Sequence, residues 1–385
     1  MLAQAAHNAG FKPLVLDVFS DLDTQQYAAD FKLLPALTIE HLTPALDYFV
    51  QHYGVTQVVY GSGFEQHPDA LRYLASRCTL LGNSPETFDL LHDKPRFFAT
   101  LKQLNIPYSE TVFVPPDNAD NWLIKPLRGQ GGVGIQRLTN TNLGLDSKVY
   151  WQKYQAGTQH SVLFLADGQH LQIIGFNTQW TAQPSNHSFP RAAWECSNGA
   201  PRHAETNEFI FAGIINYCPL ADSHKAQITN WLTKLVPAFA LTGLNSLDFI
   251  HTNGNSTVLE INPRPPASMQ LYDADLLRRH LMTASPLEDW QSCLYPPPQS
   301  GYTGYQIIYA EQDIHIPDGT IWDNGVMDIP TAGAICHTGQ PICSIIAHHN
   351  QAEAVLHELT LKQHIIQRSL YPWKTTPALI NSPNP

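Results

Sequence analysis

Short apolar runs and an amphipathic segment alternate in the first part of the chain. Residues 14–18 (LVLDV) and 55–60 (VTQVVY) are aliphatic and β-branched, and the apolar positions near 42–52 recur at helical spacing. Runs of this kind predict strands on either side of a helix, and strand–helix–strand alternation favours a parallel sheet. The opening residues, 1–13, have a helical pattern, so we expect a helix where such a domain usually begins with a strand.

After residue 84 the pattern changes to a helix followed by strands around a glycine-rich segment. Residues 85–104 predict a helix interrupted at Pro95,. Apolar residues then occupy 122–126 (WLIKP) and 135–138 (IQRL), on either side of the glycines in 129–134. Two strands around such a segment predict a hairpin with a flexible connection.

Two more hairpins and a helix are predicted further along the chain. Residues 161–176 alternate around an Asp-Gly pair at 167–168, and residues 245–264 around an Asn-Gly pair at 253–254. Both dipeptides favour tight two-residue turns. The helix is expected at about 222–241.

The remaining patterns divide the chain into three parts. Residues 184–206 are polar, with Pro, Asn and His, and predict a long loop,. After PPPQSG (296–301) the chain continues as short β segments and a helix at about 350–369, so we place a domain boundary near residue 300. The expected parts are an α/β domain, a central domain with a lid subdomain, and a β-rich region: 1–84, 85–299 (lid about 108–155) and 300–385.

Composition narrows the class of protein. Of the 385 residues 43% are hydrophobic, which is typical of a globular protein,. The 22 basic and 33 acidic residues give a formal net charge of -11, which argues against a nucleic-acid partner,. No apolar run approaches the roughly 20 residues that cross a bilayer, and no signal peptide is recognisable. The six Cys have no CxxC spacing, so we expect a cytoplasmic protein with reduced thiols,.

The glycine-rich segment is the first candidate site. It matches the dinucleotide fingerprint G-x-G-x-x-G, but that fingerprint needs a helix after the loop, and 135–138 is β-like. A flexible hairpin without ligand is another interpretation. We favour a loop that covers phosphates, because glycines let backbone N–H groups approach a polyphosphate and Lys125 precedes the loop. The four glycines are Gly129, Gly131, Gly132 and Gly134.

The second candidate site lies on the last hairpin. Glu260, Asn262 and Arg264 are two residues apart, so on a strand they point to one face,. Asp248 lies on the partner strand. Two carboxylates and an amide oxygen suit Mg²⁺, which prefers oxygen ligands and bridges to substrate phosphates, and an arginine suits a phosphoryl group or carboxylate. The alternative is an edge hairpin with exposed charges.

These features resemble the ATP-grasp superfamily in order and spacing. The resemblance covers about residues 80–275, through DKPRFF, WLIKPLRGQGGVGI, WQKY, LDFI and LEINPR. It implies the ATP-grasp fold, of the α+β or α/β class, with a preATP-grasp domain at the N-terminus and a small carboxylase-like β-rich region at the C-terminus. More narrowly, the chain is similar to carboligase-related ATP-grasp proteins associated with tetrahydromethanopterin-linked one-carbon metabolism in methylotrophs.

The resemblance implies nucleotide contacts. Lys94 and Lys125 match lysines that contact ATP phosphates in the family. Gln152, Lys153 and Tyr154 match the hinge around adenine and ribose, and Gln152 stands where the family has an acid.

The resemblance also implies the metal ligands and the catalytic groups. Asp248, Glu260 and Asn262 match the ligands of Mg²⁺, for which Mn²⁺ is an alternative. Arg264 matches the catalytic arginine, and Lys125 is its expected partner in catalysis.

Two further sets of residues are candidates for a substrate site and for a zinc site. The turn after 55–60 lies where open α/β sheets bind ligands in their crevice, so it is a candidate substrate site. An ordinary tight turn is the equally weighted alternative. The residues of this turn are Gly61, Ser62, Gly63 and Glu65. Five Cys and His residues between 336 and 349 fit no zinc pattern, and buried Cys with surface His is the favoured interpretation,.

The expected function is that of an ATP- and Mg²⁺-dependent carboxylate–amine ligase that forms an acyl phosphate and acts on small molecules. A homodimer is one option for its oligomeric state. The one-carbon resemblance extends this to biosynthesis of a methanofuran- or methanopterin-type cofactor, with glutamate joined to an aromatic amine as one option. The alternatives are a biotin-carboxylase-like carboxylase, whose carboxylate is bicarbonate, and a regulator that binds ATP without chemistry.

Overall fold

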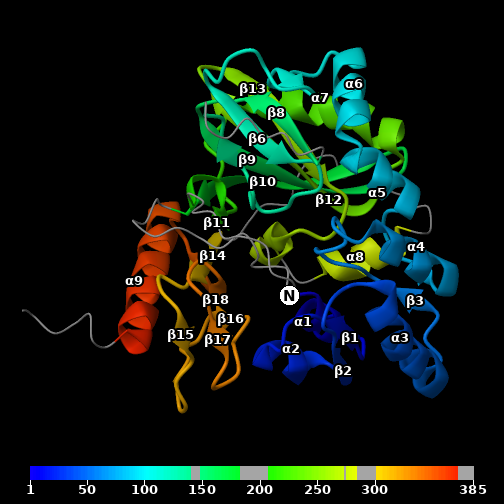
Figure 1. The fold of residues 1–385 in the computed structure, drawn as a ribbon, viewed down its shortest axis with the longest axis vertical. Helices are drawn as coiled ribbons and strands as arrows, with labels where there is room; N and C mark the ends of the chain where they lie inside the picture. The colour runs from blue at the N-terminus through cyan, green and yellow to red at the C-terminus, as the bar shows by residue number, and fades with distance from the viewer. Residues whose placement is uncertain (140–147, 183–206, 273–274, 284–300, 372–385) are drawn as a thin grey trace, which may run out of the picture.

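The computed structural model describes residues 1–139, 148–182, 207–272, 275–283 and 301–371. One large antiparallel sheet continues from the middle of the chain into its C-terminal region, and the N-terminal region lies beside the latter (Figure 1). None of the described helices combines the length and the apolar composition that a membrane span requires.

The N-terminal region contains two separate pairs of short parallel strands, β1–β2 and β3–β4. Side chains of α3 and α4, among them Leu46 and Leu71, form one buried cluster with Tyr60 and Phe88. This cluster fixes the turn after β3, which reaches toward the central domain. The elements are α1 (Leu2–Asn8), β1 (Leu14–Asp17), α2 (Leu22–Tyr27), β2 (Asp30–Leu33), α3 (Ile39–Tyr53), β3 (Gln57–Val58), α4 (Pro68–Arg77) and β4 (Thr79–Leu80).

A small antiparallel sheet follows, in the strand order β5-β8-β6-β7. Two helices precede it, and β6 pairs with β7 across the glycine-rich loop, as predicted. Trp122, Ile124 and Trp151 are buried together on one face of this sheet. The elements are α5 (Pro85–His92), α6 (Lys94–Gln103), β5 (Thr111–Val112), β6 (Trp122–Pro126), β7 (Gln136–Arg137) and β8 (Val149–Lys153).

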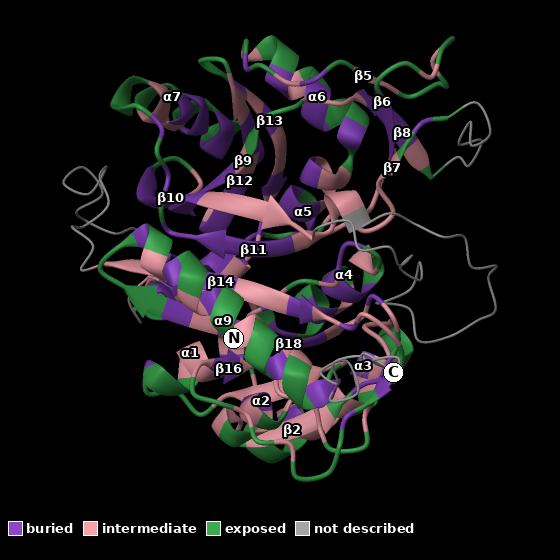
Figure 2. Cartoon of the chain, turned by 90° about the vertical axis from the view of Figure 1, so that its left-hand side faces the viewer, coloured by how far each residue is buried: buried purple, intermediate pink, exposed green. Residues whose placement is uncertain are grey.

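The large sheet has eight strands in the order β13-β12-β9-β10-β11-β14-β18-β16. Most residues of β9 and β12 are buried (Figure 2), because helices cover both faces. Leu101 of α6 and Leu232 of α7 pack with Phe164 on one face, and Leu276 of α8 packs with Leu165 on the other. The elements are β9 (Thr158–Asp167), β10 (Leu171–Thr181), η1 (Asn207–Phe209), β11 (Phe211–Ile215), α7 (Asp222–Phe239), β12 (Thr242–Thr252), β13 (Asn255–Asn262), η2 (Ala267–Leu271) and α8 (Leu276–Met282).

The C-terminal region extends the large sheet. β14 pairs with β11, and α9 packs on β14 and β18 through Val355 and Leu359. The sheet is therefore continuous across the boundary predicted near residue 300, and the division into three domains stays a prediction. The elements are β14 (Tyr302–Tyr309), β15 (Ile314–His315), β16 (Val326–Met327), β17 (Ile335–Cys336), β18 (Pro341–His349) and α9 (Ala352–Leu370).

The structure differs from the sequence-based prediction in several places. The predicted strand 55–60 is reduced to Gln57–Val58, and the parallel sheet to two pairs. The helix break lies at Asp93, one residue before α6, and Pro95 is accommodated in the first turn of that helix,. The predicted loop at 184–206 lies outside the described residues.

Candidate active site

The β12–β13 hairpin brings the predicted metal ligands together. Asn253 and Gly254 both have positive φ (48° and 78°), which the tight turn between the strands requires,. Asp248 lies opposite Glu260 in the ladder. The side-chain amide of Asn262 donates to Asp248 Oδ2 at 3.0 Å, so these side chains share one face of the hairpin.

A β-bulge in this hairpin sets which face the ligands occupy. Asp248 pairs with Glu260 and the next residue, Phe249, pairs with Val258, so Leu259 is the extra residue. Val258 is fully buried before the bulge, and Ile261 is buried after it. Strict alternation would place Val258 and Glu260 on one face. The bulge shifts the phase, so Val258 stays in the core and Glu260 is released from it.

The environment of Asp248 is that of a cation ligand. Burial, and next the charge of Glu260, raise the pKa of Asp248 to about 7. Gln179 donates to Asp248 Oδ1 at 3.4 Å. Two neighbouring carboxylates out of water repel each other, and a divalent cation between them relieves that repulsion. The donor set of two carboxylates and an amide thus fits Mg²⁺.

One buried and one partly buried lysine border this acidic cluster. Lys94 is the first residue of α6 and is 6% exposed, and its ammonium lies 3.8 Å from Glu260 Oε2. Lys125 lies on β6, on the opposite side from the buried Trp122 cluster. Burial lowers the pKa of Lys125 to about 8; the charge of Glu260 opposes this effect and that of Lys94 adds to it. Two ammonium groups in these positions fit the charge of nucleotide phosphates.

Gln152 holds Lys125 in place. The Lys125 ammonium donates to Gln152 Oε1 at 3.1 Å, and Gln152 Nε2 donates to Thr111 Oγ1 at 3.0 Å. Gln152 is 2% exposed. Both ends of its side chain are therefore bonded within the protein, which does not favour the predicted ribose contact.

The next two hinge residues face different surroundings. The Lys153 ammonium donates to the carbonyl of Asp120 at 2.8 Å and lies over the Trp122 ring, on the face of the small sheet away from Lys125. The Tyr154 ring is covered by the Arg137 guanidinium, 4.3 Å from its centroid. The predicted nucleotide contact of the Lys153 side chain is therefore not favoured by its position.

The glycine-rich loop is anchored against the large sheet. The amide of Phe211 donates to the carbonyl of Gly131 at 2.9 Å. A Cβ on Gly132, whose φ is +80°, would lie 1.8 Å from the carbonyl oxygen of Phe209. This close backbone approach requires glycine. Gly131 and Gly134 also have positive φ, whereas Gly129 does not.

The catalytic arginine predicted from the sequence is bonded to the N-terminal region. Arg264 lies two residues past the end of β13, so it does not continue the strand face of Glu260 and Asn262. Its Nε donates to Glu65 Oε1 at 3.0 Å. Glu65 Oε2 also accepts from the amide of Gly63 at 2.8 Å. Glu65 thus contacts Arg264 rather than presenting a free carboxylate to a substrate.

The other residues of this turn are ordered around Glu65. Gly63 has a φ of +107° and Gly61 packs near Leu2, while Ser62 is exposed. The turn therefore positions Glu65 and leaves Ser62 as its accessible polar side chain.

Several residues at the site gave no recognisable signal in the sequence. Thr111 contacts Gln152 from the neighbouring strand β5, and Gln179 contacts Asp248 from β10, which is separated from β12 by β9. Tyr60 places its hydroxyl 3.1 Å from the carbonyl oxygen of Pro263, next to Arg264. Single polar residues of this kind belong to no motif, and only strand pairing and domain contact reveal them.

The Cys and His residues between 336 and 349 do not converge. Cys336 and Cys343 are buried in the apolar core of the C-terminal region. His337 bonds Asp313, and His348 bonds Thr303, both near the surface. Among the described residues no group of three or more His, Cys, Asp or Glu is arranged to hold a metal.

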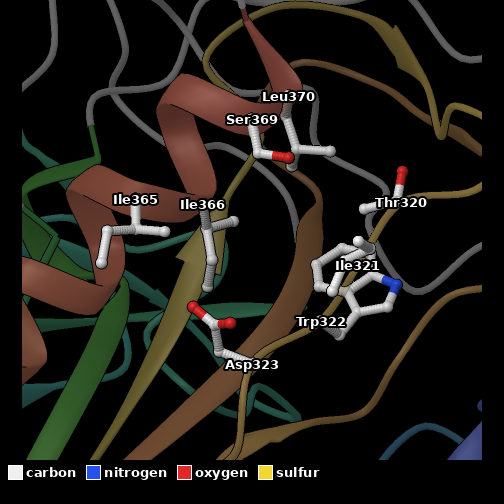
Figure 3. Close-up of a pocket in the computed structure, with 8 residues that line it drawn as sticks. All are labelled: Thr320, Ile321, Trp322, Asp323, Ile365, Ile366, Ser369 and Leu370. Carbon is white, nitrogen blue, oxygen red and sulfur yellow. The ribbon is translucent and has the colours of Figure 1, made fainter.

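Two hollows differ in size and lining. One, of about 450 Å³, adjoins Lys94 and the start of the glycine-rich loop. The other lies between α9 and residues 320–323, where Ile321, Trp322 and Ile366 contribute to its wall (Figure 3). Its volume of about 20 Å³ is close to that of one water,. It contains none of the predicted site residues, so the first hollow is the candidate substrate space.

Comparison with known proteins agrees with this arrangement. Residues 91–268 match the family model described as an ATP-grasp domain. The arginine-specific large chain of carbamoyl phosphate synthase from Bacillus subtilis is 22% identical over 204 residues, which are 48% of this chain but only 18% of that protein.

Solved structures resemble nearly the whole chain. The biotin carboxylase domain dimer of 2-oxoglutarate carboxylase from Hydrogenobacter thermophilus, in complex with MgADP, ADP and bicarbonate, has a TM-score of 0.68 and 13% identity, covering 94% of this chain and 86% of that one. N5-carboxyaminoimidazole synthetase from Staphylococcus aureus, complexed with ADP, has a TM-score of 0.64 and 16% identity, covering 94% and 93%. The chain therefore has the ATP-grasp fold, and residues 91–268 are the part that matches the ATP-grasp domain model.

Proposed function

We propose that this chain is an ATP- and Mg²⁺-dependent ligase that joins a carboxylate to an amine through an acyl phosphate. The observation that carries the proposal is the convergence of an oxygen-rich cluster, centred on Asp248 and Glu260, with the buried ammonium of Lys94 at its edge. Oxygen ligands beside lysines suit a Mg²⁺–polyphosphate complex.

Each part of the site has a role in this proposal. Lys94 and Lys125 would bind the nucleotide phosphates. Asp248, Glu260 and Asn262 would hold Mg²⁺, which when bound neutralises phosphate charge and orients the phosphates. The nucleotide base would contact the backbone of the hinge and the ring of Tyr154. The guanidinium of Arg137 covers one side of that ring.

The proposed reaction has two balanced steps. An oxygen of the substrate carboxylate attacks the γ-phosphorus of ATP, the bond between that phosphorus and the ADP oxygen breaks, and ADP leaves. The amine nitrogen then attacks the acyl carbon. The carbon–nitrogen bond forms, the carbon–oxygen bond to phosphate breaks, and phosphate leaves while the nitrogen loses a proton.

Two elements of the chain serve these steps. The guanidinium of Arg264, held by Glu65, would stabilise the charge of the transferring phosphoryl group. The glycine-rich loop, anchored through Gly131 to Phe211, would cover the acyl phosphate and exclude water that would hydrolyse it,.

An isotope experiment tests the ligase. Purified protein with ATP and Mg²⁺ is supplied with panels of acids and amines, with ¹⁸O in the acid carboxylate. The expected result is ADP formation that requires both an acid and an amine, with one ¹⁸O transferred to inorganic phosphate. ATP binding without turnover on any pair would contradict the ligase and favour the regulator.

The carboxylase alternative rests on the fold shared with the biotin carboxylase domain of Hydrogenobacter thermophilus. It predicts ADP formation that requires bicarbonate and is accelerated by free biotin. Turnover with an organic acid and an amine in bicarbonate-free buffer separates the two enzymes.

The narrower parts of the proposal rest on the resemblance noted in the sequence. We assign the ligase to the cytoplasm and to biosynthesis of a methanofuran- or methanopterin-type carrier, with Mn²⁺ able to replace Mg²⁺. The dimeric state of the Hydrogenobacter thermophilus domain supports a homodimer. Activity with glutamate and an aromatic amine, and sedimentation at twice the mass of one chain, are the expected results.

A further inference from the structure

The hollow beside Lys94 has the dimensions of a small-molecule site. Its volume is about 450 Å³, within the range of roughly 300–1,000 Å³ that is usual for ligand pockets. Its wall comes from α4, α5, the start of α6 and the two residues before the glycine-rich loop: Arg72, Asp89, His92, Lys94, Leu127 and Arg128, with Asp93 and Pro95.

Opposite charges on this wall are only partly paired. Asp89 Oδ2 accepts from Arg72 at 2.7 Å. The other carboxylate oxygen, Oδ1, is buried and has no hydrogen bond to any described residue. The Arg128 guanidinium lies 3.9 Å from this oxygen, too far for a hydrogen bond,.

Arg128 is also incompletely bonded. Its hydrogen bond to the carbonyl oxygen of Glu65 is 3.4 Å long, and its side chain is 40% exposed. Asp89 Oδ1 and the Arg128 guanidinium therefore face each other across the wall without bonding. A buried carboxylate oxygen left without a donor is unfavourable, so a ligand that supplies the donor would be favoured there.

We infer that this cavity binds the ammonium and the carboxylate of a free α-amino acid. The ligand ammonium would donate to the Asp89 carboxylate, whose side chain is 30% exposed, and the ligand carboxylate would accept from Arg128. Leu127 and Pro95 offer apolar surface for a side chain. A simple anion fits less well, because Asp89 and Asp93 place negative charge on the same wall.

This inference rests on the proposed function, in which the amino acid is one of the two substrates. Lys94 lines the cavity and also lies 3.8 Å from Glu260. An amino acid in the cavity is therefore beside the lysine that would bind nucleotide phosphate. His92 lines the same cavity and stays neutral near pH 7, because burial, and then the charge of Lys94, lower its pKa to about 4.

Calorimetry on the full chain tests the inference. The twenty common amino acids are titrated singly, and the tightest binder is compared with its decarboxylated amine and its deaminated acid. We expect either analogue to bind at least tenfold more weakly. Asp89→Asn and Arg128→Gln should each weaken binding of the amino acid at least tenfold.

Two matched variants control for loss of surface charge. Asp69→Asn removes the other partner of Arg72, an exposed carboxylate that does not line the cavity. Arg96→Gln removes an exposed arginine from the start of α6. Both should bind the amino acid as the unmodified chain does.

Three results would overturn the inference: no amino acid binds, an analogue with one charge binds as tightly, or inorganic phosphate binds with the same dependence on Asp89 and Arg128. Titration of ADP with Mg²⁺ on the same samples separates this inference from the proposed function. Amino-acid binding without nucleotide binding supports the cavity site and removes the ligase. Nucleotide binding without amino-acid binding would leave the ligase proposal standing and remove the cavity site.

Discussion

Arg264 Nε lies 3.0 Å from Glu65 Oε1, although the two residues are 199 positions apart in the chain. Glu65 is 3% exposed. Burial alone would raise its pKa, but the charge of Arg264 and the hydrogen bond from its side chain bring the net pKa below the usual range. The N-terminal region thus supplies the counter-ion of the arginine that follows the β12–β13 hairpin.

Replacement of this counter-ion should affect both stability and catalysis. In Glu65→Gln the largely buried guanidinium loses its charged partner, and we expect a loss of about 3–5 kcal/mol in the free energy of unfolding,. We also expect kcat to fall with little change in the Kd of ADP, because Arg264 would act on the transferring phosphoryl group. Urea unfolding and ADP-release kinetics measure these effects.

The exposed carboxylate of Glu40 on α3 offers a matched control, and Glu40→Gln should change neither quantity. The ion pair also predicts a pH dependence. Because the pKa of Glu65 is lowered in the folded protein, its stabilising contribution is present above the unfolded pKa and is lost as pH falls through the folded pKa. Equal stability of Glu65→Gln and the unmodified chain at neutral pH would contradict the role of the pair.

Lys125 donates to the uncharged side chain of Gln152, and from this we predict how ADP binding responds to alkaline pH. The pKa of Lys125 is about 8, so its charge is lost above that pH in the free protein and the affinity for ADP should fall. Gln152→Glu places a carboxylate where the amide now accepts from the ammonium at 3.1 Å. The added charge raises the lysine pKa, and the decline in affinity should move to higher pH.

Calorimetric Kd values for ADP with Mg²⁺, measured from about pH 7 to about pH 10, test this shift. Gln103→Glu on the exposed side of α6 is the control. If the two Glu variants give the same pH profile, then Gln152 does not set the charge of Lys125.

Glu260 tests the metal cluster. Glu260→Gln keeps the shape of the side chain but removes one anionic ligand, so we expect Mg²⁺-dependent turnover to be abolished and Mg²⁺ affinity to fall. The neighbouring Thr257→Ser, on the same strand, should leave both unchanged. Near-normal turnover of Glu260→Gln across a Mg²⁺ titration would remove Glu260 from the site.

Alanine variants of two adjacent glycines distinguish the effect of backbone strain from that of steric overlap in the loop. Gly131 and Gly132 both have positive φ, but a Cβ on Gly131 meets nothing within 4 Å, whereas one on Gly132 would overlap the carbonyl of Phe209. Gly132→Ala should therefore release the loop from β11 and weaken ADP binding roughly tenfold or more, while Gly131→Ala should cost only the strain of its φ, about 1–2 kcal/mol.

Hydrogen exchange of the Phe211 amide reports directly on this contact, because that amide donates to Gly131. We expect faster exchange in Gly132→Ala than in Gly131→Ala. Identical exchange and identical ADP affinity in both variants would show that the contact with Phe209 does not hold the loop.

The sequence alone predicted most of the long elements and the proximity of Asp248, Glu260 and Asn262 on one hairpin. The Asn253-Gly254 turn fixed the register that places Asp248 opposite Glu260, because both turn residues accept positive φ. Local alternation and turn chemistry act over a few residues and are visible without a structure. The same local reasoning extended the strand to Arg264, and the structure ends it at Asn262.

Only the tertiary structure decided the partners of these residues. No local pattern in the sequence indicates the bulge at Leu259 or the half-paired Asp89. Nor does any local pattern connect Lys125 with Gln152, to which it donates, or Arg264 with Glu65. Buried charges take whichever partner the packed domains bring within hydrogen-bonding distance, and that partner depends on the whole fold. The sequence therefore determined which chemical groups are present, and the packing of the N-terminal region against the two sheets decided what each group contacts.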